Sequence, residues 1–131
     1  MFWRKKKPIE RDGVGINWPA RSFRDKPKKL KNHYEQRKAR GFSDADWWSF
    51  DTYIAGVIGQ AVAMFRDQGV GYPGDMNEES FAALCTEISE PLLRYAEDKF
   101  DIFDREEEEK VYNEAVEAMK KFSERLGCWW D

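Results

Sequence analysis

Two pairs of acidic residues have a type and spacing that could suit catalysis. Glu87 and Glu90 form one acid-x-x-acid pair, and Asp98 and Asp101 form a second pair shortly after it. Clustered carboxylates bind hard cations such as magnesium. However, Pro91 interrupts the segment, and such pairs are common in a chain with 25 Asp and Glu residues. We therefore predict no metal site and no catalytic residue.

The other residues with suitable chemistry favour binding over catalysis. The sequence contains no P-loop, GxSxG motif, Cys–His pair or zinc-ligand spacing. It does contain flat aromatic side chains, a carboxylate among apolar neighbours, and arginines that could meet a phosphate. Such groups can hold a nucleotide-like ligand, and the predicted ligand-binding set is Trp47, Trp48, Asp51, Arg66, Tyr72 and Arg94. The alternative that these aromatic residues form the core stays open, and no cofactor is predicted.

Several of these residues fall on the best-specified helix of the sequence, residues 41–68. Ser43 is its predicted N-cap, and Asp46 completes a capping box. Phe42 and Trp47 have the spacing of a hydrophobic staple. Apolar residues then recur at helical intervals and predict one inward-facing stripe, made of Trp47, Phe50, Ile54, Val57, Ile58, Ala61, Val62 and Phe65.

Two features of this helix allow either a site or ordinary packing. Asp51 falls inside the apolar stripe, where a carboxylate must be paired or hydrogen-bonded because an unpaired buried charge is very costly. Ala55, Gly59 and Ala63 form an edge of small residues that lets another helix, or a ligand, come close. Both interpretations remain open at this point.

Two more helices complete the predicted fold. Asn77 is expected to cap the second helix, and Pro91 is expected to kink or divide it. Asp104 is expected to cap the last helix, which ends at Gly127. The glycine-rich loop at residues 69–77 is a candidate wall of a site. The predicted fold class is all-α, a compact bundle of three to four helices with an extended basic N-terminal arm.

Charge divides the chain into a basic arm at residues 1–40 and a helical domain at residues 41–131. The arm carries 14 Lys and Arg against 4 acidic residues, whereas the domain carries 8 against 21. Such an arm can bind nucleic acid, or it can lie on the acidic domain or on a neighbouring subunit. Its predicted contact residues are Lys5, Lys6, Lys7, Lys28 and Lys29. We expect residues 28–40 to form a short helix and interpret His33 as a surface residue.

Cysteine usage and hydropathy indicate the compartment. Cys85 and Cys128 lie far apart and predict neither a disulfide framework nor a metal site, which favours a reducing compartment. No apolar run is long enough to span a membrane, and no apolar segment follows the basic N-terminal residues as it would in a secretory signal. The expected location is cytoplasmic, without a membrane partner. Trp129 and Trp130 are expected to dock on the domain or on a second subunit.

The motif around the first helix resembles a family of small, acidic, all-helical phage and prophage proteins. The shared pattern is G-[FWY]-x-D-x-D-x-W-x-x-D-x-x-I-A followed by Gly-Tyr-Pro, and it falls on Gly41, Phe42, Asp44, Asp46, Trp48, Asp51, Ile54, Ala55, Gly71, Tyr72 and Pro73. The resemblance covers about residues 41–85 and the C-terminus, while the N-terminal arm is longer than the family pattern. It implies a phage-type origin and carries no established activity.

Three hypotheses follow for the function. The first is a non-enzymatic host-interaction protein that counters host defence by sequestering a nucleotide-like ligand or by blocking a host protein, with a homo-oligomer as an expected form. The second is a virion or packaging protein whose arm contacts nucleic acid or a neighbouring subunit. The third is a metal-dependent nucleotide hydrolase, because the two acidic pairs are similar to the magnesium-binding motifs of all-helical nucleotide pyrophosphohydrolases.

Overall fold

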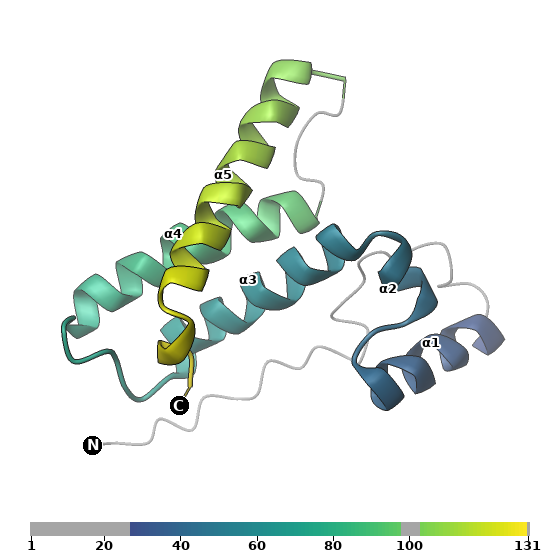
Figure 1. The fold of residues 1–131 in the computed structure, drawn as a ribbon, viewed down its shortest axis with the longest axis horizontal. Coiled ribbons are helices and arrows are strands. Elements are labelled where there is room, and N and C mark those ends of the chain that lie inside the picture. The colour runs from purple at the N-terminus through teal and green to yellow at the C-terminus, as the bar shows by residue number, and fades with distance from the viewer. Residues whose placement is uncertain (1–26, 98–102, 131) are drawn as a thin grey trace.

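The computed structural model describes residues 27–97 and 103–130, and these residues form an all-α fold (Figure 1). No strand occurs in the described ranges. The predicted all-α fold class is therefore confirmed, whereas most of the predicted extended arm, residues 1–26, lies outside the described residues. In chain order the helices are α1 (Pro27–Arg40), α2 (Asp44–Trp48), α3 (Phe50–Gln68), α4 (Glu78–Ala96), α5 (Arg105–Glu124) and the short 3-10 helix η2 (Leu126–Cys128).

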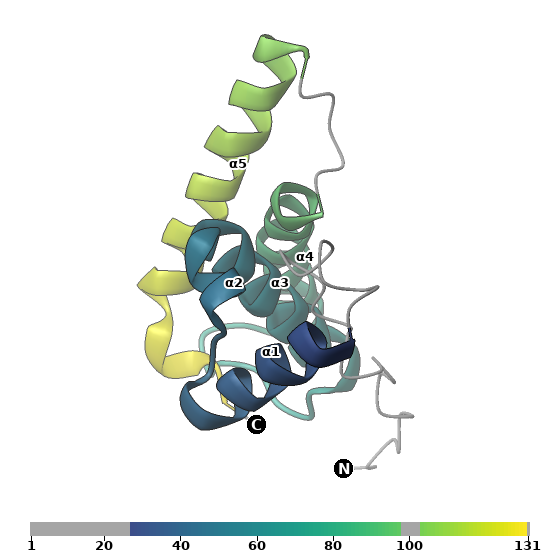
Figure 2. The same ribbon diagram turned by 90° about the vertical axis from the view of Figure 1, so that its right-hand side faces the viewer.

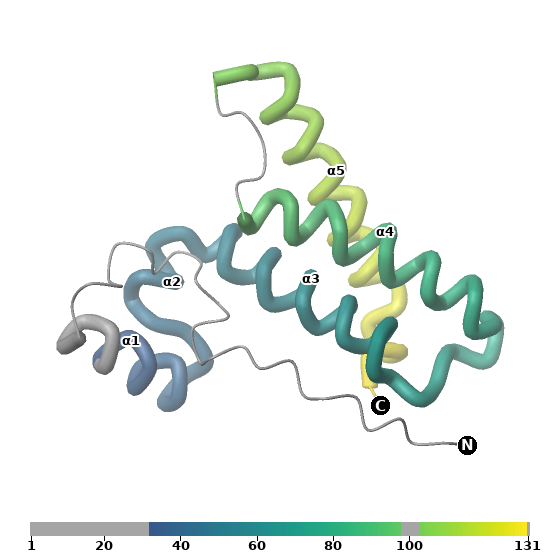
Figure 3. The backbone as a smooth tube through the Cα atoms, turned by 180° about the vertical axis from the view of Figure 1, so that it is seen from behind, coloured from purple at the N-terminus to yellow at the C-terminus, as the bar shows by residue number. Residues whose placement is uncertain are grey.

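Helices α3 and α4 form the centre of the molecule and pack antiparallel to each other (Figures 1 and 3). Small residues of α3 allow this close approach, since Ala55 and Gly59 are buried against α4. The core between the helices includes Val62 of α3 and Ile88 and Leu92 of α4, all without exposed surface. Of the two interpretations of the small-residue edge, helix packing is the one that the structure shows.

Gly59 lies at a close approach of α3 and α4. A Cβ atom added at Gly59 would lie 3.0 Å from Cγ of Leu93 and 3.2 Å from Cβ of Leu92. We expect Gly59→Leu to push the two helices apart and to lower the free energy of unfolding by about 1–3 kcal/mol, as overpacked cores do. Urea denaturation measures the loss. The matched control is Ala61→Leu on the exposed side of α3. Equal stability of the two variants would contradict the packing described here.

Helix α5 crosses the α3–α4 pair, and its N-terminal half projects beyond the pair (Figures 1 and 2). Its buried residues, Val111, Ala115 and Ala118, recur on one face. The predicted N-caps are confirmed at both later helices, since Asn77 accepts a hydrogen bond from Ser80 N and Asp104 accepts from Glu106 N and Glu107 N. At α4 the capping box is completed by Ser80. Pro91 lies inside α4 without dividing it, which corrects one of the two outcomes expected there.

The predicted helix at residues 41–68 is two helices, because the chain breaks its helical path at Ser49. The capping box of Ser43 and Asp46 is confirmed at the start of α2. The predicted staple is wrong, because Phe42 packs edge-on against Phe50, with ring centroids 5.7 Å apart, and Trp47 is exposed. Trp47, Phe50 and Ala61 are therefore exposed members of a stripe predicted to face inward.

Among the residues that the structure describes, no helix is both long and apolar enough to cross a lipid bilayer.

Candidate functional site

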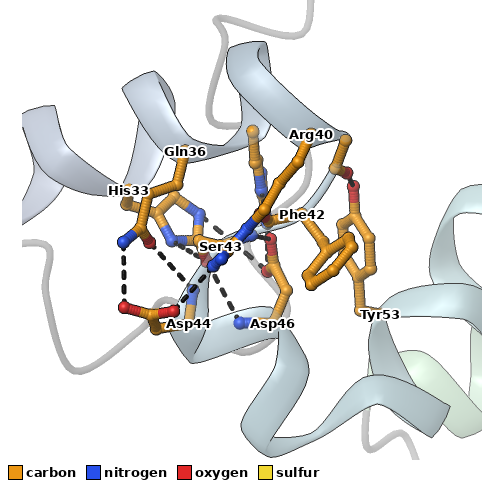
Figure 4. Close-up of polar contacts among 10 residues, drawn as sticks. His33, Gln36, Arg40, Phe42, Ser43, Asp44, Asp46 and Tyr53 are labelled. Carbon is orange, nitrogen blue, oxygen red and sulfur yellow. Dashed lines mark hydrogen bonds and ion pairs between the residues drawn. The ribbon is translucent and has the colours of Figure 1, made fainter.

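A turn at Gly41 folds α1 back onto α2 and starts the most polar region of the interior. Gly41 has a φ of +90°, a left-handed conformation that glycine adopts at little cost. Its N–H donates to Arg37 O at 2.8 Å, which ends α1, and its carbonyl accepts a hydrogen bond from the Tyr53 hydroxyl of α3. The turn is thereby fixed from both sides. We call the buried or nearly buried residues His33, Arg37, Ser43 and Asp46 the α1–α2 junction. Figure 4 labels His33, Ser43 and Asp46 of this junction.

The strongest contact in the α1–α2 junction joins Arg37 of α1 to Asp46 of α2. Arg37 Nε and Nη2 donate to the two carboxylate oxygens at 2.7 and 2.6 Å, and Asp46 is completely buried. Burial by itself would raise the pKa of Asp46. Hydrogen bonds from Arg37 and from the Ser43 backbone, together with the Arg37 charge, outweigh that effect and hold this pKa below its usual value. The pair therefore stays ionised at neutral pH.

His33 and Ser43 complete the α1–α2 junction. His33 Nδ1 and Ser43 Oγ are 2.6 Å apart, and Ser43 Oγ also accepts the Asp46 N–H. His33 is only 3% exposed, so the interpretation of this residue as a surface histidine is wrong. The sequence held a signal for it, because His33 and Arg37 are four residues apart and share one face of α1.

A serine, a histidine and an aspartate side by side suggest nucleophilic catalysis, but the burial and distances of these residues indicate a structural role. Ser43 and Asp46 are buried, so a substrate carbonyl has no path to the serine oxygen. Both oxygens of Asp46 are taken by Arg37, and His33 Nε2 lies 4.0 Å from Asp46 Oδ1, beyond hydrogen-bond distance. The α1–α2 junction therefore positions α2 on α1.

His33 makes the stability of the α1–α2 junction depend on pH. Burial, and next the nearby charge of Arg37, lower the pKa of His33 from its usual 6.5, and Asp46 opposes the shift less strongly. A histidine that resists protonation when folded contributes stability above its unfolded pKa, and this stability is lost as pH falls through its folded pKa. We expect the melting temperature to fall as pH decreases from about 7 to 5.

The variant His33→Gln tests this expectation, because glutamine can bond Ser43 but does not titrate. Its melting temperature, measured by circular dichroism, should change less than that of the wild type between pH 7 and pH 5. Asp46 titrates only at lower pH, where its depressed pKa acts in the same direction. Identical pH profiles for the two proteins would contradict the role of His33.

The outer side of α2 carries two exposed tryptophans. Trp47 is 69% exposed and Trp48 is 86% exposed, although Asp46, the residue directly before them, is completely buried. The acidic side chains of Asp44 and Asp51 are also exposed and lie within four residues of them in the chain. Asp44 is held at the rim of the α1–α2 junction by Arg40 and Gln36 (Figure 4). The two tryptophans therefore lie on a helix that the contacts of Asp44 and Asp46 hold against α1.

Asp51 and Arg94 lie on the side of the bundle where α3, α4 and α5 meet. Asp51 is exposed rather than buried in the apolar stripe, and it accepts a hydrogen bond from the Tyr95 hydroxyl of α4. Asp51 and Tyr95 line a cavity of about 250 Å³ between the three helices, and Arg94 is not part of its lining. Arg94 is paired with Glu114 of α5 at 3.3 Å. The sequence prediction of a buried Asp51 is therefore corrected.

Tyr72 and Arg66 lie toward the other end of α3. Arg66 is bonded to Asp67 and to Thr86, and Tyr72 lines a second cavity of about 450 Å³. Phe65, the residue of α3 that lines this cavity, lies 14 positions after Asp51, which corresponds to roughly 21 Å at a rise of 1.5 Å per residue. The structure thus distributes the six predicted ligand-binding residues over three places, with the tryptophans on α2, and does not bring them together in one pocket.

The other predicted groups fall partly outside the described residues. Glu87 is paired with Lys121, Glu90 is exposed, and no group of three or more potential metal ligands occurs in residues 27–97 and 103–130. Asp98 and Asp101, which complete the proposed magnesium motif, lie outside these ranges. The same is true of Lys5, Lys6 and Lys7, whereas Lys28 and Lys29 lie in the first turn of α1.

Comparison with known proteins gives no relative for this chain. No protein-family model matches it, and neither a curated protein nor a solved structure is significantly similar to it. The function is therefore argued from the geometry above.

Proposed function

We propose that this chain is a non-enzymatic binding protein of phage type that acts in the host cytoplasm by engaging and blocking a host protein. The observation that supports the proposal is the pair of exposed tryptophans, Trp47 and Trp48, on the fixed helix α2. Large aromatic side chains dominate the binding energy of protein interfaces. A partner is bound more tightly when such side chains are held in place before contact, because less side-chain freedom is lost.

The proposal also specifies the chemistry of the partner. The tryptophans fit an apolar pocket, and the exposed carboxylate of Asp51, four residues after Trp47 in the chain, favours a basic group at the edge of that pocket. The domain at residues 41–131 carries 21 acidic against 8 basic residues, which adds long-range attraction to a basic partner. The phage-type origin rests on the resemblance of the sequence motif, which includes Trp48 and Asp51.

Site-specific crosslinking tests the proposal. A photoreactive side chain placed at Ala45 on α2 should capture a host protein in living host cells, and the combined change Trp47→Ala and Trp48→Ala should abolish the capture. The matched control is Tyr112→Ala, which removes an exposed aromatic side chain from α5. Binding of the purified partner should weaken at least tenfold in the tryptophan variant. Capture that is equal in both variants would refute the proposal.

A further inference from the structure

The 450 Å³ cavity that Tyr72 lines lies near the C-terminal end of α3. It is separate from Trp47 and Trp48, which lie on α2 before the N-terminal end of α3. Its floor is formed by Phe65 of α3 and Phe81 of α4. One wall is the loop from Val70 to Asp75, and the other is the C-terminal segment with Gly127, Cys128 and Trp130. Figures 1 and 3 both show that this loop and the C-terminal end of the described chain lie close together.

The two walls of the cavity are joined by an ion pair. Arg125, just before η2, donates to both carboxylate oxygens of Asp75 at 3.1 and 2.8 Å. Behind the C-terminal wall, Trp129 packs on Phe65 and Phe81 and anchors this segment to the core. The cavity is therefore framed by contacts that exist without a ligand, and its size lies in the range of small-molecule sites, roughly 300–1,000 Å³.

The lining of the cavity indicates which ligands fit it. Tyr72 and Trp130 contribute one exposed aromatic side chain from each wall, above a floor of two phenylalanines. Asp75 is the only charged residue among the described residues that line it, and Arg125 neutralises its charge. Aromatic walls without net charge favour a flat, uncharged ring over a metal ion or a free phosphate. Ring stacking of this kind binds nucleobases with little dependence on their identity.

Three glycines line the cavity. A Cβ atom added at Gly71, Gly74 or Gly127 would meet no atom within 4 Å, so the backbone at these three positions borders free volume. Backbone N–H and C=O groups at glycines can approach a ligand closely, and they can supply the hydrogen bonds that a ring with donors and acceptors needs. A purely hydrocarbon ring would leave these groups without such bonds.

From this geometry we propose that the cavity between the 70–75 loop and the C-terminal segment binds an uncharged planar heteroaromatic ring of the nucleobase or nucleoside class, stacked on Tyr72 and Trp130. The site lies on residues that the proposed protein-binding surface does not use. Loss of one function would therefore leave the other intact, and the two proposals are tested separately.

Cys128 provides a reporter inside the proposed site. It lines the cavity and is half-buried, whereas Cys85, the only other cysteine, is completely buried. Burial raises the pKa of Cys85 to about 11, so this thiol does not form the reactive thiolate near neutral pH. N-ethylmaleimide should therefore modify Cys128 alone in the folded protein, and a bound ring should slow that reaction. Mass spectrometry of the intact protein and its peptides measures both rates.

The experiment uses adenosine and uridine as probes on the full chain. Either nucleoside at millimolar concentration should slow modification of Cys128 severalfold, and ribose at the same concentration should not. Tyr72→Ala and Trp130→Ala should each weaken the protection about tenfold, as expected for one lost stacking partner. Tyr112→Ala is the control, because this tyrosine is exposed to the same degree as Tyr72 but lies on α5.

Three results would overturn the proposal. The first is a modification rate at Cys128 that neither nucleoside changes up to its solubility. The second is equal protection by ribose, which would show that no ring is recognised. The third is protection that survives in both Tyr72→Ala and Trp130→Ala, which would place the bound nucleoside elsewhere. Ligand-observed NMR, with saturation transferred from protein to nucleoside ring protons, checks binding independently of the thiol.

Discussion

Replacing Asp46 by alanine should destabilise this protein by about 3–5 kcal/mol, the largest effect we expect from one substitution. The change leaves Arg37 largely buried without its anionic partner, and an uncompensated buried charge carries a cost of about that size. It also removes the carboxylate that accepts the Ser43 N–H in the capping box of α2. Urea denaturation measures the loss, and hydrogen exchange should show early opening of α1.

A neighbouring aspartate offers the control for this prediction. Asp44 also forms an ion pair, with Arg40 at 2.6 Å, but its side chain is exposed to solvent. Exposed pairs contribute little to stability, so Asp44→Ala should leave the urea midpoint almost unchanged. The double change Arg37→Met and Asp46→Leu should recover much of the stability, since it removes both buried charges together. Equal losses of stability in Asp46→Ala and Asp44→Ala would contradict the expectation that the buried ion pair contributes more to stability than the exposed one.

The features that the sequence predicted correctly are determined locally. Ser43, Asn77 and Asp104 were recognised as N-caps because a cap depends only on the following three residues. Helical periodicity in the same segments then predicted an all-α fold. The edge formed by Ala55 and Gly59 was also visible, since only small side chains at this spacing allow two helices to come so close.

The errors concern which side of a helix is covered, and this depends on contacts between distant segments. The helix was expected to continue through Ser49, but the break allows Asp46 to meet Arg37 while α3 follows its own path along α4. Helical periodicity assigns Trp47 to the inward-facing stripe, and the flat aromatic faces of Trp47 and Trp48 assign both to a ligand site. Nothing in the local sequence shows that the two side chains face outward.

The candidate site could be predicted only in part for the same reason. Tyr72 was identified from its glycine-rich loop, which is a local signal. Its cavity exists because the C-terminal segment folds back over that loop, and the pairing of Asp75 with Arg125 joins residues 50 positions apart. Trp130 therefore joins Tyr72 in the lining of one cavity only through the fold. Asp51 is the reverse case, since periodicity indicated a buried residue that the structure leaves exposed.

The two adjacent tryptophans at the C-terminus should differ sharply when each is replaced by alanine. The expected docking on the domain is confirmed for Trp129, which contacts Phe65 of α3, Phe81 of α4 and Phe122 of α5. It is not confirmed for Trp130, which is exposed. Trp129 stacks on Phe122 with centroids 5.4 Å apart, and its indole N–H donates to Phe122 O at 3.0 Å. Trp129→Ala should therefore lower the free energy of unfolding by about 2–4 kcal/mol.

Trp130 serves as the control in the same segment, because it is 78% exposed and leaves no cavity in the core when removed. Trp130→Ala should keep the melting temperature of the wild type. The melting temperature of Trp129→Phe should lie between those of the wild type and Trp129→Ala, because phenylalanine retains the ring stacking but lacks the N–H donor. Thermal unfolding followed by circular dichroism gives all three values. A large loss in Trp130→Ala, or none in Trp129→Ala, would show that the C-terminal segment does not hold α3, α4 and α5 together in this way.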